Sequence, residues 1–239
     1  MTSPTSLSVI SRLRGGLIVS CQAGPESALH EPIFIAALAR EAERGGAVGL
    51  RINGPQNVAA VRRVTSLPIL GIYKQDIPGY EVYITPTFES AREVVAAGAD
   101  IVALDGTSRP RPGNLTLPEL IAQIHERLQV LVMADISTAE EGYRAAEAGA
   151  DLIATTLAGY TPYSRPPQPH QPDLELIREL AAHVSVPIIA EGRITTPEQA
   201  LAVLEAGAYA LVVGTAITAP AAITRRFVEA LASRQAVPR

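Results

Sequence analysis

Polar and charged side chains end several apolar runs of this sequence, and their types are those that move protons or bind anions. Apart from these end residues, the apolar composition of each run predicts a buried strand. An unpaired buried charge is costly, so charges of both signs at the ends of several strands indicate a shared site. The strand-end residues are Gln22, Arg51, Lys74, Asp105, Asp135, Thr155 with Thr156, Glu191, and Gly214 with Thr215. For any one of them alone, a salt bridge at the rim is an equal explanation.

Lys74 and Glu191 are the pair best suited to proton transfer. They end the third and seventh of eight predicted strands, which lie on opposite sides of a barrel mouth. An amine on one face of a carbon and a carboxyl on the other could remove a proton and replace it with inversion. Lys74 then needs a lowered pKa, to which Arg51 could contribute, and burial should raise the pKa of Glu191. Asp135 could hold the substrate or orient Lys74.

A phosphate site is predicted beside this pair. Gly192 and Arg193 follow the seventh strand, and Gly214 and Thr215 follow the eighth. Loops after these two strands, with backbone N–H groups at the start of a short helix, commonly bind phosphate in barrels.

The elements that position these residues repeat along the chain. A Gly-Ala turn between a helical stretch and an apolar run occurs at Gly46, Gly98, Gly149 and Gly207, at spacings of 52, 51 and 58 residues. Glycine just after a helix is a common stop signal. The strand runs are 15–22, 48–52, 67–74, 100–106, 129–136, 151–156, 186–194 and 209–214. The helical stretches are 32–44, 55–66, 89–97, 118–127, 139–148, 172–183, 197–206 and 222–232.

Eight alternating strands and helices predict a (β/α)8 TIM barrel, with an open doubly wound sheet as the alternative. The 239 residues divide into eight such units with little to spare, so we expect one domain over 1–239 with a short N-terminal extension, 1–14. Residues 161–172 carry five prolines and no periodicity. They are equally compatible with a rim loop over the site and with a stiff surface loop.

Composition limits the function classes. Lysine and arginine number 20 against 24 acidic residues, without charge runs, which argues against nucleic acid or a membrane surface as partner. A single cysteine, Cys21, excludes an internal disulfide and suits a cytoplasmic location. No apolar run reaches the roughly 18 residues that a membrane span needs. None of the four histidines ends a strand, so no metal site is predicted.

Several segments resemble the N-acylglucosamine-6-phosphate 2-epimerase family, whose members are also called N-acetylmannosamine-6-phosphate 2-epimerases. The resemblance runs from about residue 15 to the last helix, and its most specific motifs are IYK, ADIST and AEGRI. The segments are GGLIVSCQA (15–23), GLRING (49–54), PILGIYKQD (68–76), YITPT (83–87), IVALDGTSRPRP (101–112), MADIST (133–138), TTLAGYT (155–161), IAEGRI (189–194) and VVGTAIT (212–218).

The resemblance implies a phosphate-binding barrel that needs no metal or organic cofactor. Such an enzyme interconverts N-acetylmannosamine-6-phosphate and N-acetylglucosamine-6-phosphate in sialic-acid and amino-sugar catabolism. Lys74 corresponds to the family's catalytic lysine and Glu191 to its partner carboxylate. Gln22, Arg51 and Asp135 correspond to substrate-site residues, and we place Thr155 with them. Family members often have an arginine that helps to hold the phosphate where this chain has Ala219, so the resemblance implies one phosphate contact fewer.

Two other functions stay open at this point. One is a different phosphosugar epimerase, although pentulose-phosphate enzymes use histidine metal ligands that this set of strand ends lacks. The other is a sugar-phosphate sensor that binds without turnover. The resemblance suggests a homodimer, which could pair through Phe227, Val228 and Leu231 of the last helix. Alternatively, these residues pack only on their own barrel.

Overall fold

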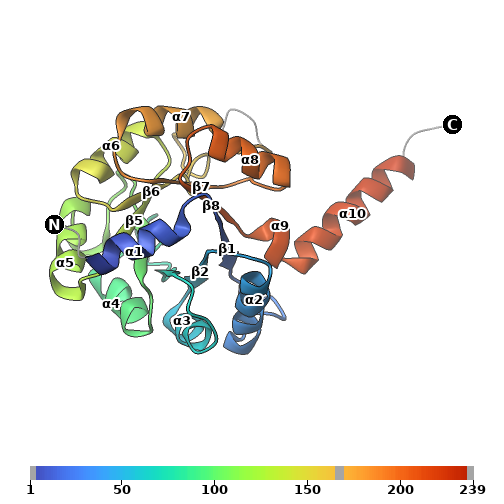
Figure 1. Ribbon diagram of the computed structural model, residues 1–239, viewed down its shortest axis with the longest axis horizontal. Helices are drawn as coiled ribbons and strands as arrows, with labels where there is room; N and C mark the ends of the chain where they lie inside the picture. Colours follow the sequence, from blue (N-terminus) through green and yellow to red (C-terminus); the bar gives the residue numbers. More distant parts are fainter. Residues whose placement is uncertain (1–3, 165–169, 236–239) are drawn as a thin grey trace.

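The computed structural model describes residues 4–164 and 170–235, and in these residues eight parallel strands close into a barrel in chain order (Figure 1). The last strand pairs with the first, where Ile18 lies beside Val212. The predicted barrel is therefore confirmed, and the open sheet is wrong. The strands are β1 (Leu17–Cys21), β2 (Gly49–Asn53), β3 (Ile69–Ile72), β4 (Ile101–Asp105), β5 (Leu131–Asp135), β6 (Leu152–Ala154), β7 (Ile188–Glu191) and β8 (Ala210–Val213).

Helices surround the strands, and four of them end at the glycines of the sequence repeat. Thr138 caps its helix with a reciprocal bond from Glu141, and Thr87 and Thr116 cap theirs in the same way. The four repeat glycines have φ of 94°, 110°, 94° and 109°, values that residues with a side chain rarely adopt. These helices are α2 (Pro32–Arg44), α3 (Pro55–Arg62), α4 (Phe88–Ala96), α5 (Leu117–Leu128), α6 (Ala139–Glu147), α7 (Leu174–His183) and α8 (Pro197–Glu205).

Alternate strand residues fill the barrel, and the residues between them pack against the helices. One buried cluster includes Ile18, Leu70, Ile101, Met133 and Ile189, whose spacing on the strands places them inside the barrel. Every residue of β4 and of β5 is buried, as expected for strands covered on both faces. Within the described ranges, no helix is long and apolar enough to cross a membrane.

The N-terminal segment, expected only as an extension, forms helix α1 (Pro4–Leu13) at the end where the strands begin. Leu13 is fully buried, and a Cβ at Gly49 would meet it at 2.8 Å. The Arg14 guanidinium lies 4.8 Å over the Tyr209 ring, and the Tyr209 hydroxyl donates to the Ile10 carbonyl. This helix therefore closes the barrel opposite the carboxyl ends of the strands.

The last helix, α10 (Pro220–Gln235), follows the short helix α9 (Thr215–Thr218) and projects away from the barrel between α8 and α2 (Figure 1). Residues 224–233 are all exposed, including Phe227 at 70%, Val228 at 57% and Leu231 at 66%. The expectation that these side chains pack only on their own barrel is therefore wrong. A barrel normally covers its last strand with such a helix.

Candidate active site

A pocket of about 350 Å³ opens at the carboxyl ends of the strands, beside β1, β7 and β8. Among the residues that line it are seven of the ten predicted site residues, namely Gln22, Lys74, Glu191, Gly192, Arg193, Gly214 and Thr215. Thr156, Tyr160 and Ala219 line it as well. The remaining three predicted residues, Arg51, Asp135 and Thr155, are not among its lining residues.

Arg51 and Asp135 form a buried ion pair next to Glu191. Arg51 Nη1 and Nη2 donate to the two carboxylate oxygens of Asp135 at 2.9 and 2.6 Å, and both side chains are at most 1% exposed. Arg51 Nη1 also lies 3.0 Å from Glu191 Oε2. Burial acts to lower the pKa of Arg51, but the two carboxylates outweigh it and the pKa is raised. The guanidinium is therefore a fixed cation between two acids.

Thr155 and Thr156 follow β6 and serve different partners. The Thr155 hydroxyl donates to the Glu191 carbonyl and accepts from the Glu191 N–H, both at 3.0 Å, which fixes the backbone at the end of β7. The Thr156 hydroxyl lies 2.6 Å from Asp135 Oδ1 and 3.0 Å from Glu191 Oε2. Strand-end position alone could not tell these two adjacent threonines apart.

Glu191 and Lys74 have pKa values shifted toward each other. Burial raises the pKa of Glu191, and the nearby Asp135 charge adds to this, while Arg51 opposes it. Lys74 is an exposed residue, but the protein displaces water from part of its side chain, which lowers the pKa of Lys74, and the Arg51 charge lowers it further. Both shifts favour the uncharged forms, and pKa values displaced in this way are typical of groups that transfer protons in active sites.

Lys74 follows the end of β3 by two residues, and contacts of its backbone hold it in place. Its N–H donates to Asn53 Oδ1 at 2.9 Å, and it forms a single antiparallel bridge with Ile84. The buried Thr85 accepts from the Tyr73 N–H and donates to the Ala103 carbonyl at 2.7 Å. The sequence showed no role for Thr85, whose φ of 45° marks a tight return of the chain.

The loops after β7 and β8 form the other wall of the pocket. Arg193 Nη1 donates to the Ala158 carbonyl at 2.9 Å, and its guanidinium lies 5.4 Å over the Tyr160 ring. Gly192, with φ of 113°, lets the chain turn directly after Glu191. Gly214 precedes α9, and Ala219 ends that helix at the pocket wall.

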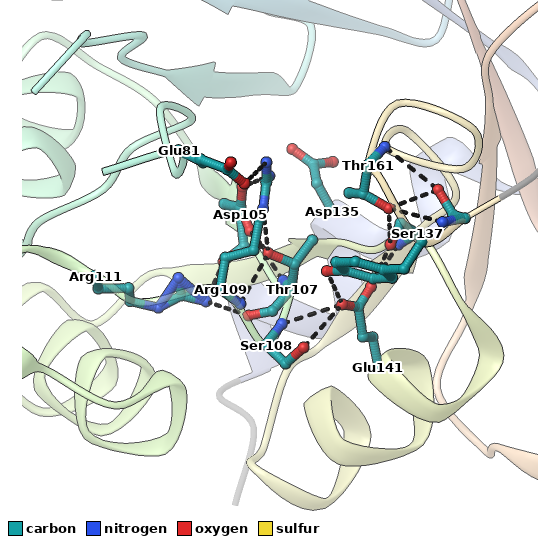
Figure 2. A network of polar contacts seen from close by, with 12 residues as sticks. Glu81, Asp105, Thr107, Ser108, Arg109, Arg111, Asp135, Ser137, Glu141 and Thr161 are labelled. Carbon is teal, nitrogen blue, oxygen red and sulfur yellow. Dashed lines mark hydrogen bonds and ion pairs between the residues drawn. The ribbon is translucent and has the colours of Figure 1, made fainter. Parts of the chain in front are cut away.

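A second polar network covers the ends of β4, β5 and β6, outside the pocket (Figure 2). Its centre is Glu141, which is 3% exposed and accepts from the Ser137 N–H and hydroxyl and from the Tyr163 hydroxyl at 2.7 to 2.8 Å. The strand-end Asp105 belongs to this network and pairs with Arg109 at 2.6 Å. Thr161 and Tyr163, from the start of the proline-rich loop, attach here, whereas residues 165–169 of that loop lie outside the described residues.

Within the part of the chain that the structure describes, no cluster of three His, Cys, Asp or Glu residues is arranged to hold a metal ion. His125 instead contacts Asp151 at 2.8 Å, and His30 contacts Glu31. Cys21 is buried, which raises the pKa of its thiol to about 12.

Comparison with known proteins connects this geometry to a family. The family model described as "Putative N-acetylmannosamine-6-phosphate epimerase" matches residues 35–233. The chain belongs to this family. A relative from Caldanaerobacter subterraneus subsp. tengcongensis, named "Putative N-acetylmannosamine-6-phosphate 2-epimerase", is 53% identical over 96% of both chains. A relative of the same name from Cutibacterium acnes is 48% identical over 93% of this chain and 96% of its own.

Solved structures agree. The N-acetylmannosamine-6-phosphate 2-epimerase from Clostridium perfringens superposes with a TM-score of 0.89 at 42% identity, over 92% of this chain and 95% of that one. A thiamine phosphate pyrophosphorylase from Pyrococcus furiosus, at 18% identity and a TM-score of 0.59, shares the fold alone. The resemblance found in the sequence is thus confirmed.

Proposed function

We propose that this epimerase-family chain interconverts N-acetylmannosamine-6-phosphate and N-acetylglucosamine-6-phosphate by inverting C2, as an isomerase of amino-sugar and sialic-acid catabolism. The relatives' names supply the reaction. One observation connects this reaction to Lys74 and Glu191. Both residues line the same pocket, where the pKa of Glu191 is raised and that of Lys74 is lowered. A pair that holds one proton between its two members can act in both directions.

The reaction moves a proton at a carbon next to a carbonyl. In the open-chain sugar, one of the two groups removes the C2 proton from one face, and the C–H electron pair moves into the C1–C2 enolate. The other group then delivers a proton to the opposite face of C2. Lys74 and Glu191 exchange the roles of base and acid in the reverse direction, and no cofactor enters this scheme.

The remaining predicted substrate residues divide into two kinds. Gln22 lines the pocket, and its buried Oε1 has no hydrogen-bond partner among the described residues, so it is free to accept from a sugar hydroxyl or amide N–H. Arg51, Asp135 and Thr155 act from behind the pocket wall. Arg51 contacts the side chain of Glu191 and Thr155 binds its backbone, whereas Asp135 holds Arg51.

The phosphate is bound by Gly192, Arg193, Gly214 and Thr215 in this proposal, because the loops after β7 and β8 form one wall of the pocket. Ala219 leaves out the arginine that family members often carry. We expect Ala219→Arg to lower KM about tenfold or more, since a charge-assisted bond to phosphate contributes about 1.5–3 kcal/mol. Steady-state kinetics checks this, and an unchanged KM would place the phosphate elsewhere.

We also propose a homodimer that pairs through α10, in the cytoplasm, where the free thiol of Cys21 suits a reducing environment. The exposed Phe227, Val228 and Leu231 lie on a projecting helix and need a cover. Helix α2 lies beside the place where α10 leaves the barrel (Figure 1), and its residues Ile33 and Phe34 are exposed as well. Sedimentation velocity should show a dimer for the native chain and a monomer for Phe227→Glu. A native monomer would contradict the proposal.

The purified chain tests the function directly. Incubated with either sugar phosphate alone, it should produce the other one, followed by proton NMR of the two anomeric signals. Binding of both compounds without any product would favour the sensor. Turnover of pentulose phosphates in place of the amino sugars would favour the other epimerase.

A further inference from the structure

Thr156 lines the pocket, and its hydroxyl lies between two carboxylates. Its Oγ1 is 2.6 Å from Asp135 Oδ1 and 3.0 Å from Glu191 Oε2, both within hydrogen-bond distance. A hydroxyl carries a single proton and can also accept. It therefore donates to only one of the two carboxylates at a time. The other contact is a hydrogen bond only if Thr156 accepts a proton from that carboxyl group.

The two carboxylates differ in how they are held. Arg51 donates hydrogen bonds to both carboxylate oxygens of Asp135, so Asp135 keeps an ionic partner whatever the state of Glu191. Glu191 changes its protonation during the proposed reaction. Arg51 Nη1, 3.0 Å from Glu191 Oε2, can donate to Glu191 but cannot accept the O–H of the protonated form, because a guanidinium has no acceptor. A protonated Glu191 needs an acceptor for its O–H, and Thr156 Oγ1 offers one.

We infer that Thr156 is a positioning residue whose hydroxyl reverses with the protonation state of Glu191. When Glu191 is ionised, Thr156 donates to it. When Glu191 is protonated, its O–H donates to Thr156, and Thr156 donates to Asp135. Each state of the mostly buried carboxyl then keeps a hydrogen bond, and neither state carries the cost of an unsatisfied polar group. This role rests on the proposed epimerase function.

The charged groups around Glu191 do not replace this hydroxyl. Arg51 on β2 and Lys74 after β3 favour the ionised carboxylate, whereas Asp135 on β5 and burial favour the protonated one. In a Thr156→Val variant the ionised form loses a charge-assisted bond and the protonated form loses a weaker neutral one. The pH at which Glu191 gives up its proton should therefore rise.

The test compares Thr156→Val and Thr156→Ser with the native enzyme, by measuring kcat and KM for the amino-sugar phosphates as a function of pH. For valine we expect kcat to fall about 10- to 100-fold with KM within about threefold, and the Glu191 limb of the kcat profile to move up by about one pH unit. Serine should restore most of kcat and the position of that limb. Thr156→Ala carries the same expectation if the valine variant does not fold.

Thr161→Val is the matched control. Thr161 is also buried and hydrogen-bonded, but it contacts Ser137 and Ser164 outside the pocket. The Thr161→Val variant should therefore leave the pH profile of kcat unchanged. An unmoved limb in Thr156→Val, or a serine variant as impaired as valine, overturns the role of Thr156 while the proposed function stands. A native enzyme that does not interconvert the two sugars overturns both.

Discussion

Two glutamates at the same end of this barrel are largely buried, yet their environments push them in opposite directions. Glu141 is 3% exposed, and although burial acts to raise its pKa, hydrogen bonds from Ser137 and Tyr163 outweigh it and the pKa is lowered. The Glu191 side chain is 16% exposed, and burial raises its pKa despite the neighbouring Arg51. Hydrogen-bond donors lower the pKa of Glu141, whereas burial and the Asp135 charge raise the pKa of Glu191.

The two glutamates therefore have different roles. Glu141 ties together the loops after β4, β5 and β6 through Ser108, Ser137 and Tyr163 (Figure 2), and a fixed charge suits that task. Glu191 shares its surroundings with Asp135 and faces the pocket, and there an exchangeable proton is of use. Removing the charge of Glu191 should therefore impair activity, and removing the charge of Glu141 should impair stability.

The largest effect is expected from Glu191→Gln. Loss of a general acid–base group should lower kcat about 10²- to 10⁴-fold in both directions. Because the pKa of Glu191 is raised in the folded protein, its ionised form opposes folding above its ordinary pKa, so glutamine should be as stable as glutamate at neutral pH, or more so. Kinetics together with urea unfolding measures both, and a variant that keeps full kcat would break the comparison.

Arg51→Met should be the most destabilising change on the pocket side. It leaves the fully buried Asp135 without its cation, which typically costs about 3–5 kcal/mol of unfolding free energy. Arg51→Lys keeps the charge and loses the two-pronged contact, so it should lose less stability. Chemical denaturation ranks the three proteins, and equal stability of methionine and native chains would contradict the ion pair described above.

Glu141→Gln should lower stability by about 1–3 kcal/mol at neutral pH, because several donors lose their charged acceptor, while kcat stays within a few-fold of native. Its pKa is lowered on folding, so its contribution is fully present above the ordinary value of 4.5 and is lost as the pH falls through the lowered pKa. The gap between native and variant in denaturant unfolding should close toward acid pH. A gap independent of pH would show that the charge plays no part.

The smallest effect is expected from Tyr163→Phe, which removes one of the donors to Glu141. A single hydrogen bond to a charged group contributes about 1.5–3 kcal/mol when buried, and this partly exposed one should contribute about 1 kcal/mol or less. Thermal unfolding should show a small fall in Tm with unchanged kcat. A larger loss than that of Glu141→Gln would mean that Tyr163 acts through other contacts.

Much of the barrel could be predicted because its signals are local. The glycines after α2, α4, α6 and α8 adopt the left-handed conformation that their position in the repeat indicated. Thr138 and Glu141, three residues apart, form a reciprocal cap that also depends only on the neighbouring chain. Such features depend on the chain within a few residues.

The rest depends on contacts between distant segments. Thr155 and Thr156 are identical and adjacent, and only the closed barrel turns one toward the Glu191 backbone and the other toward its carboxyl. The apolar pattern of α10 predicted a helix with a face to cover, but not that the helix would leave its own barrel. Glu141 caps its own helix through a local contact, whereas its bonds to Ser108 and Tyr163 come from loops distant in sequence.

Turnover in D₂O, followed by NMR at C2 of both sugar phosphates, tests the central claim that Lys74 and Glu191 transfer a proton at this carbon. The native enzyme should place deuterium at C2 of the product. Lys74→Ala and Glu191→Gln, folded as judged by circular dichroism, should convert at least about 100-fold more slowly. Product that retains its original hydrogen, formed at undiminished rate by the Lys74→Ala variant, would contradict the account.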